Sequence, residues 1–239
     1  MKKVITDPAR TPIPIVALDF QTVGEALAMV ERLGDACRFY KVGSELFTAA
    51  GPQVVETLRS LGSDVFLDLK LHDIPNTVLG AARSAAQLGV RLLTVHASGG
   101  QEMVKAAVEG AGEKCGILGV TILTSFDAPA LGMAWGRGKV DVRREVIRLA
   151  GIAHIAGAHG VVCGGREAGA LGRKYGPGLR LLVPGIRAEN APADDQKRTV
   201  TPAAAAKAGA TYVVIGRMVT RAVDPRSAML AANLKPDGG

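Results

Sequence analysis

The sequence of residues 66–77 is FLDLKLHDIPNT. Its first half alternates apolar and charged side chains, which predicts a β-strand with two different faces. Asp68 and Lys70 are two positions apart, so both point to the same face of the strand. The opposite face carries Leu67, Leu69 and Leu71. An acid and a base are therefore aimed at one place.

A second carboxylate, Asp73, follows three residues after Lys70. Pro75 favours the start of a helix here, since proline is well tolerated in a first helical turn. Asp68 and Asp73 would then lie on either side of the Lys70 ammonium. A cluster of ordinary surface ion pairs would show the same spacing. The rest of the chain decides between a reactive site and such a cluster.

Strands and helices alternate along the whole chain. Short apolar segments predict strands at residues 13–18, 39–43, 64–70, 90–96, 116–123, 160–163, 179–183 and 211–215. Periodicity predicts helices at residues 23–33, 52–61, 75–88, 102–109, 140–158, 166–175, 202–209 and from 225. Among their starts, a capping box is predicted at Thr22 and Glu25, and N-caps at Thr201 and Asp224. This number of units fits the roughly 250 residues of a (β/α)8 barrel, or TIM barrel. An open, doubly wound sheet is the alternative, although no GxGxxG turn follows the first strand.

We expect a single barrel domain over residues 1–239, because no change in composition marks a second domain. Residues 1–12 are expected to be an N-terminal extension. Residues 184–200 form a connection longer than the roughly 12 to 15 residues usual in compact domains, and it is either a loop that grips a phosphate group or an ordinary polar loop. Residues 126–139 form a second long connection, in which Trp135 either packs or contacts a ligand.

The composition indicates in which cellular compartment the protein is found and whether its cysteines form disulfides. No apolar run approaches the roughly 18 residues that cross a membrane. No hydrophobic stretch like that of a signal peptide follows the charged start, so we expect a cytoplasmic protein without membrane contact. The cysteines are widely separated and outside any CxxC pattern, which predicts buried thiols without disulfides or zinc. They are Cys37, Cys115 and Cys163.

The net charge of +7 suits an anionic partner. The basic residues are scattered and no aromatic stacking platform lies among them, which argues against nucleic acid as that partner. An anionic small substrate is the simpler explanation. Composition alone allows both.

In a barrel, polar residues at the ends of the strands converge on the face that carries the active site. By this argument that face holds Asp19, Lys41, Asp68, Lys70, His96, Thr124, Arg187 and Arg217. Gly216 and Arg217 follow the eighth strand, where barrels often bind phosphate. Arg187 follows the seventh strand and could grip the same anion, because arginine offers two parallel donors.

The four histidines lack the spacing of metal ligands, so no metal site is predicted. No serine or cysteine is placed beside a histidine, which leaves nucleophilic catalysis without support. His72 and His96 either reach the pocket or have structural roles. What remains is a set of charges of alternating sign, Lys41, Asp68, Lys70 and Asp73. Carboxylates around Lys70 favour its protonated form, which makes it a candidate proton donor to a carbanion.

These motifs together closely resemble the bacterial orotidine 5'-phosphate decarboxylases. The resemblance rests on DLKLHDIPNT at 68–77, Asp19 after the first strand, KVG at 41–43, LTS at 123–125, PGIR at 184–187, Gln196 and the final GR at 216–217. It implies a (β/α)8 barrel, a homodimer, and cofactor-free conversion of orotidine 5'-phosphate to UMP and carbon dioxide. This reaction completes the synthesis of the pyrimidine nucleotide UMP.

The resemblance also implies a role for each matching residue. Lys70 would donate a proton to C6 of the pyrimidine, within a charged network completed by Lys41, Asp68 and Asp73. Residues reaching the active site of the partner subunit would be Asp73, Ile74 and Thr77. Asp19 and Lys41 would bind ribose hydroxyls, and Thr124 the pyrimidine. The phosphate would be bound by Arg187, Gln196, Gly216 and Arg217.

Three residues depart from the family pattern, Ser98, Gly164 and Met218. None has a predicted catalytic role. The closest rival function is a magnesium-dependent sugar-phosphate lyase or decarboxylase of the same barrel superfamily, such as hexulose-phosphate synthase. Those enzymes place a carboxylate metal ligand on the second strand, where this chain has Lys41. A rival of another class is a protein that binds nucleotides or nucleic acid without catalysis.

Overall fold

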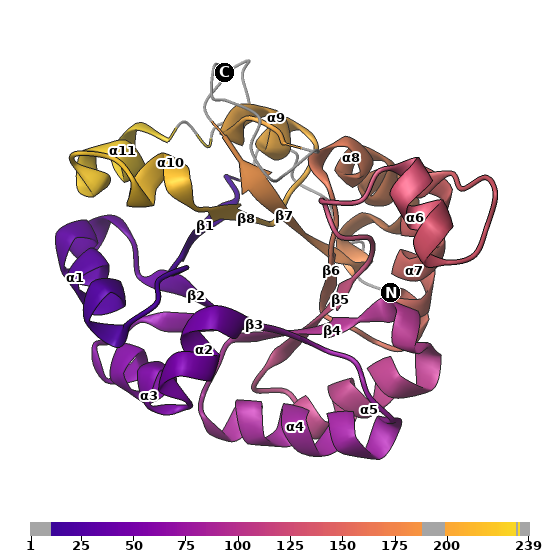
Figure 1. Ribbon diagram of the computed structural model, residues 1–239, viewed down its shortest axis with the longest axis horizontal. Coiled ribbons are helices and arrows are strands. Elements are labelled where there is room, and N and C mark those ends of the chain that lie inside the picture. Colours follow the sequence, from indigo (N-terminus) through magenta and orange to yellow (C-terminus); the bar gives the residue numbers. More distant parts are fainter. Residues whose placement is uncertain (1–10, 188–198, 233, 235–239) are drawn as a thin grey trace.

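The computed structural model describes residues 11–187, 199–232 and 234. Within these residues, eight parallel strands close into a barrel in the order β1-β2-β3-β4-β5-β6-β7-β8 (Figure 1). The ring is closed by pairing of β1 with β8, with Ile13 beside Tyr212 and Val16 beside Ile215. The predicted (β/α)8 barrel is therefore confirmed, and the open-sheet alternative is wrong because its edge strands would not pair.

The strands lie close to their predicted positions. They are β1 Ile13–Ala17, β2 Phe39–Gly43, β3 Asp64–Leu71, β4 Leu92–His96, β5 Gly116–Val120, β6 Gly160–Val162, β7 Arg180–Ile186 and β8 Tyr212–Ile215. The prediction that the fifth strand reaches residue 123 is wrong. The apolar run does continue to Leu123, but Ile122 and Leu123 leave the sheet and line a cavity.

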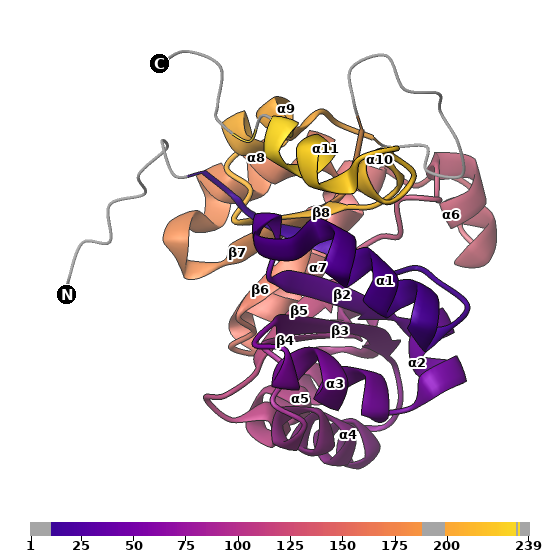
Figure 2. The ribbon, with the colours of Figure 1, turned by 90° about the vertical axis from the view of Figure 1, so that its left-hand side faces the viewer.

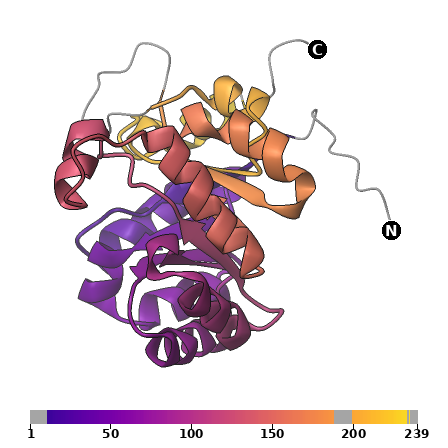
Figure 3. The ribbon, with the colours of Figure 1, turned by 90° about the vertical axis from the view of Figure 1, so that its right-hand side faces the viewer.

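Helices surround the barrel (Figures 1 and 3). Those that were predicted are α1 Val23–Leu33, α3 Gln53–Ser60, α4 Pro75–Gln87, α5 Gln101–Ala111, α7 Val142–Ile155, α8 Gly165–Tyr175, α9 Pro202–Lys207 and α11 Pro225–Ala231. The capping box predicted at Thr22 and Glu25 is present, and Thr201 and Asp224 cap α9 and α11 with their side chains. Such caps satisfy amide groups that have no partner inside a helix.

Three short helices were not predicted: α2 Ser44–Ala50, α6 Ala128–Ala134 and α10 Arg217–Thr220. Each lies in the connection after a strand, and Figure 2 shows all three toward one end of the barrel. The described chain also contains three short 3-10 turns, η1 Gly34–Ala36, η2 Ala97–Gly99 and η3 Gly176–Gly178. The connection at 126–139 is thus partly helical, because Asp127 caps α6 through the amide of Ala130. Its Trp135 packs against the core and lies under the guanidinium of Arg137.

The core has two layers. The inner layer fills the barrel with side chains of the strands, namely Ile15, Ala17, Phe39, Phe66, Leu92, Leu118, Leu182, Tyr212 and Val214. The outer layer packs the other faces of the strands against the helices. The strands are therefore buried on both sides, as is usual for parallel sheets, and the burial of each large aliphatic side chain stabilises the fold by about 1.5–3 kcal/mol.

Close packing of the outer helices depends on a small residue. In α5, a Cβ atom at Gly110 would collide with the backbone of Leu79 in α4. Glycine thus lets the two helices approach closely, side by side below the sheet (Figure 3). Cys37, Cys115 and Cys163 are buried, as predicted, and within the described residues none of them forms a disulfide. Burial raises the pKa of the Cys115 thiol to about 12, which keeps it protonated.

Two predicted segments fall partly outside the described residues. They are the N-terminal extension, of which residues 1–10 are not described, and the phosphate loop, of which residues 188–198 are not described. Of the helices in the described part of the chain, none combines the length and apolar character that crossing a membrane requires.

At the start of the sixth, seventh and eighth strands, His159 lies among polar groups at the amino-terminal end of the barrel. Its Nε2 atom is 3.0 Å from the Tyr212 hydroxyl, and its Nδ1 is 3.4 Å from Arg180. Burial, together with the nearby Arg180 and Arg91, lowers the pKa of His159 to about 4. The folded protein therefore keeps this imidazole neutral at a pH where an unfolded chain would protonate it.

We predict that His159 makes the protein less stable in acid. The folded protein holds His159 neutral, so the free energy of unfolding is not lowered by this residue above the unfolded pKa of 6.5. As the pH falls from 6.5 toward about 4, the unfolded chain takes up a proton that the folded protein does not, and the free energy of unfolding decreases progressively. Urea unfolding midpoints measured across this range should fall less steeply in His159→Gln than in the wild type. His154→Gln, at an exposed site on α7, is the control. Equal slopes for wild type and His159→Gln would contradict the prediction.

Candidate active site

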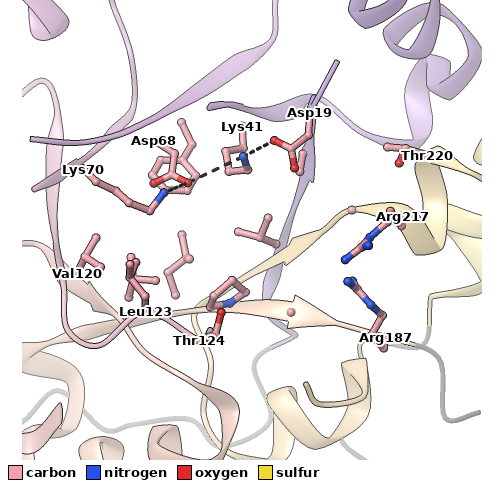
Figure 4. A pocket seen from close by; sticks show the side chains of 18 of the residues that line it. Asp19, Lys41, Asp68, Lys70, Val120, Leu123, Thr124, Arg187, Arg217 and Thr220 are labelled. Carbon is pink, nitrogen blue, oxygen red and sulfur yellow. Dashed lines mark hydrogen bonds and ion pairs between the residues drawn. The ribbon is translucent and has the colours of Figure 1, made fainter. Parts of the chain in front are cut away.

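A cavity of about 500 Å³ opens at the carboxyl ends of the strands. Its walls include side chains from β1, β2, β3, β5, β6, β7 and β8 or from the connections that follow them (Figure 4). The cavity brings together these residues of the predicted site: Asp19, Lys41, Asp68, Lys70, Thr124, Arg187, Gly216 and Arg217. Gln196 lies outside the described residues.

Four charged side chains form a row along one side of the cavity (Figure 4). The Lys41 ammonium is 2.7 Å from Asp19 Oδ1 and 3.9 Å from Asp68 Oδ2. Lys70 Nζ donates to the same Asp68 oxygen at 2.8 Å. The Asp68 side chain is only 14% exposed and that of Lys41 only 11%. Charges so removed from water need partners, and this row supplies them in alternating sign.

The backbone of β3 departs from regular strand geometry at Lys70. Its φ angle is 52°, in the left-handed region, and the pairing register with β4 shifts between Leu67 and Leu71. Such a conformation costs about 1–3 kcal/mol for a residue other than glycine. It persists only where the surroundings hold it, and strain of this kind often occurs at functional sites.

Thr94 of β4 is a residue that the sequence analysis missed. Its hydroxyl accepts a hydrogen bond from the Lys70 amide and donates one to Asp68 Oδ1, each 2.9 Å long. Thr94 is completely buried. The available signal was a single hydroxyl within the otherwise apolar run LLTV at 92–95. Threonine is common in strands, so that signal alone is weak.

Cations gather at a second position in the cavity. In Figure 4 the side chains of Arg187 and Arg217 point toward each other, and they lie apart from the row of four charges. Arg187 follows β7, and its guanidinium donates to the carbonyl of Ile186 at 3.1 Å. Gly216 separates β8 from Arg217. This pair of guanidinium groups can bind an anion such as phosphate through several parallel hydrogen bonds.

Apolar residues line much of the space between these charged groups. They include Phe66, Val120, Ile122, Leu123, Val162, Leu182 and Val214, with Thr124 beside them. Small-molecule sites commonly combine such apolar walls with a few placed polar groups. The arrangement suits a ligand with an anionic end for the arginines, polar groups that meet the charged row, and an apolar part.

Asp73, Ile74 and Thr77 do not line this cavity. All three are exposed, and the Ile74 side chain has 66% of its surface accessible. Asp73 accepts a hydrogen bond from the Ile74 amide at 2.6 Å. In the described part of the chain no ion pair joins Asp73 to Lys70. The expectation that Asp68 and Asp73 of one chain lie on either side of the Lys70 ammonium is therefore wrong. The turn after β3 carries Asp73 outward instead.

His72 and His96 are also absent from the cavity wall. Their rings lie 5.4 Å apart, between the end of β3 and the end of β4. Burial lowers the pKa of His96, and the nearby His72 and Lys70 lower it further. His72 is exposed and His96 is partly buried, and neither contributes to the lining of the cavity. Among the described residues, no three His, Cys, Asp or Glu side chains are grouped as metal ligands would be.

The comparison with known proteins identifies the family. Residues 12–232 match the model of the orotidine 5'-phosphate decarboxylase / HUMPS family. The chain belongs to this family. The resemblance inferred from the sequence is thereby confirmed.

Its relatives cover almost the whole chain. An orotidine 5'-phosphate decarboxylase of Halorhodospira halophila is 48% identical over 223 residues, covering 92% of this chain and 94% of that protein. One of Anaeromyxobacter dehalogenans is 50% identical over 215 residues, covering 90% and 94%. The crystal structure of orotidine 5'-phosphate decarboxylase from Lactobacillus acidophilus has a TM-score of 0.84 and 36% identity, covering 96% of this chain and 100% of that one.

Gly43 lies directly under the Lys41–Asp19 ion pair. A Cβ atom there would be 3.0 Å from Lys41 Nζ and 3.4 Å from Asp19 Oδ1. We predict that Gly43→Ala displaces the ammonium and weakens binding of UMP by about tenfold, the value of one charge-assisted hydrogen bond. Isothermal titration calorimetry measures this change.

The matched control is Gly24→Ala, because a Cβ at that helical glycine meets no atom within 4 Å. Its UMP affinity should equal that of the wild type. Unchanged affinity in a folded Gly43→Ala protein would show that the position of this ammonium does not matter for binding.

Proposed function

We propose that this protein catalyses cofactor-independent decarboxylation of orotidine 5'-phosphate to UMP and carbon dioxide, with Lys70 as the proton donor, in the cytoplasm. The observation that carries the proposal is the Lys70 ammonium, held by Asp68 inside a cavity that has two arginines elsewhere in its wall. Membership of the family and the names of close relatives support the same reaction.

The reaction requires stabilisation of a localised negative charge. When the bond from C6 to the carboxylate breaks, its electron pair stays on C6 in an orbital in the plane of the ring. The π system cannot delocalise that pair. Lys70 provides a nearby cation, and it then transfers a proton from Nζ to C6 while carbon dioxide leaves. The neutral amine regains its proton from solvent.

Repulsion between Asp68 and the substrate carboxylate makes a smaller contribution. Two like charges about 4 Å apart repel by about 4 kcal/mol at an effective dielectric constant of 20. Enzymes commonly lower barriers by about 8–23 kcal/mol. Repulsion alone is therefore insufficient, so stabilisation of the carbanion and binding energy from distant groups must supply the larger share.

The remaining residues have proposed binding roles. Asp19 and Lys41 bind the ribose hydroxyls, and Thr124 binds the pyrimidine. The loop 184–200 grips the phosphate. The groups assigned to this phosphate are Arg187, Gln196, Gly216 and Arg217. The positions of the two arginines in the cavity wall support this assignment.

The family model also includes the sugar-phosphate branch, for which a metal dependence is expected. Lys41 argues against that branch, because its ammonium lies 3.9 Å from Asp68 and would repel a divalent cation bound there. Full activity in EDTA is the result expected of the decarboxylase. Activity lost in EDTA and restored by magnesium would favour the other branch.

We also propose that the active protein is a homodimer in which Asp73, Ile74 and Thr77 reach the cavity of the partner subunit. The exposure of this turn supports the proposal, since Asp73, Ile74 and Thr77 must be accessible on one subunit in order to reach the cavity of another. In a two-fold dimer the same contact occurs twice, so each cavity receives one such turn.

We predict that Lys70→Ala lowers kcat for orotidine 5'-phosphate by at least about 10⁴-fold, because it removes both the proton donor and the cation beside C6. Loss of the substrate absorbance, followed in EDTA, measures the rate. Lys105→Ala, on the exposed face of α5, is the matched control and should keep the wild-type rate. A turnover rate of Lys70→Ala close to that of the wild type would refute the assignment of Lys70 as the proton donor. A wild-type protein that shows no turnover but binds nucleic-acid duplexes in a salt-sensitive way would indicate a non-catalytic protein.

The dimer proposal predicts that two inactive variants restore activity when mixed. Lys70→Ala and Asp73→Asn subunits, unfolded and refolded together, form hybrid dimers with one cavity that has both wild-type residues. Random pairing gives about one quarter of the wild-type activity per subunit, because half of the dimers are hybrids and one of two sites is intact in each. No recovery in dimers shown to be hybrid would place Asp73 in the cavity of its own subunit, and full activity of Asp73→Asn by itself would place Asp73 outside catalysis.

A further inference from the structure

Thr94 links the backbone of Lys70 to the carboxylate of Asp68. The Lys70 amide can only donate a hydrogen bond, so the Thr94 oxygen is the acceptor in that 2.9 Å contact. Its own proton is then free to point to Asp68 Oδ1, also at 2.9 Å. One hydroxyl therefore fixes the main chain of the lysine and the side chain of the acid.

The hydroxyl replaces a hydrogen bond that a regular strand would make with its neighbour. Pairing between β3 and β4 is regular up to Leu67 and resumes, with a shifted register, at Leu71. Lys70 lies in this irregular part with φ at 52°. Its amide would lack a partner in the sheet without the Thr94 hydroxyl. The left-handed conformation of Lys70 therefore depends on β4 for support.

The hydroxyl also decides which oxygen of Asp68 faces the lysines. Oδ1 is engaged by Thr94, and Oδ2 is shared by Lys70 at 2.8 Å and Lys41 at 3.9 Å. A carboxylate held at one oxygen cannot rotate freely. The Thr94 contact thus helps to fix the position of the Oδ2 atom, to which Lys70 donates directly and which Lys41 faces at a greater distance.

We propose that Thr94 is a positioning residue for decarboxylation, which holds Lys70 and Asp68 in their reactive arrangement without touching the substrate. Thr94 is completely buried and does not line the cavity. The proposal rests on the roles proposed above for Lys70 and Asp68. It predicts that loss of the hydroxyl lowers kcat much more than it weakens binding.

The experiment compares Thr94→Val, which removes the hydroxyl at nearly constant volume, with Thr94→Ser, which retains it. We expect kcat of Thr94→Val to fall on the order of 10²-fold, the effect of a small misplacement of reacting groups. KM and UMP affinity should stay close to wild type, because the arginines are unaffected. Thr94→Ser should recover most of the lost rate.

Amide hydrogen exchange at Lys70, followed by NMR, supplies a readout that is independent of turnover. Exchange should be faster in Thr94→Val than in the wild type, and Thr94→Ser should restore its protection. Thr94→Ala is measured in parallel, so that the test does not depend on the folding of one variant. The matched control is Thr121→Val, since Thr121 is also buried but donates its hydroxyl to the Val162 carbonyl.

The outcomes separate this inference from the function on which it rests. Wild-type kcat in a folded Thr94→Val or Thr94→Ala protein would overturn the positioning role while leaving the decarboxylase intact. An equal loss of kcat in Thr121→Val, or a failure of Thr94→Ser to recover activity, would also overturn it by showing a general effect of packing. No turnover by the wild type, or full turnover by Lys70→Ala, would instead overturn the proposed function.

Discussion

The arrangement of the site depends on the hydrogen bonds and ion pairs of the Asp68 carboxylate. Its two oxygens are shared among the Thr94 hydroxyl, the Lys70 ammonium and, at greater distance, the Lys41 ammonium. A carboxylate only 14% exposed is unstable without such partners. Because these partners come from β2, β3 and β4, these three strands must pair before this part of the site exists.

The barrel also keeps two groups of charged side chains apart. The row from Asp19 to Lys70 is balanced in charge and belongs to the first three strands, whereas Arg187 and Arg217 follow the seventh and eighth strands. A single anionic ligand can bind the arginines while its other end lies against the row. Binding energy gained at one end can then stabilise the transition state at the other.

Local sequence rules predicted most of the fold because they act over a few residues. Apolar runs located every strand, and capping at Thr22, Thr201 and Asp224 located helix starts. The short helices α2 and α10 were missed because they have no side-chain cap to mark their starts, whereas α6 was missed although Asp127 caps it. Asp73 was misplaced relative to Lys70 because spacing along the chain does not give the direction of a turn.

The sequence by itself determined the barrel, the family and the residue types that gather at its open end, because strand ends in this fold converge whatever their details. Only the tertiary structure decided the role of Thr94, the left-handed backbone of Lys70 and the outward position of Asp73. Each of these depends on a contact between strands or on the path of a turn. Such contacts join residues that are far apart in the chain, so no local pattern records them.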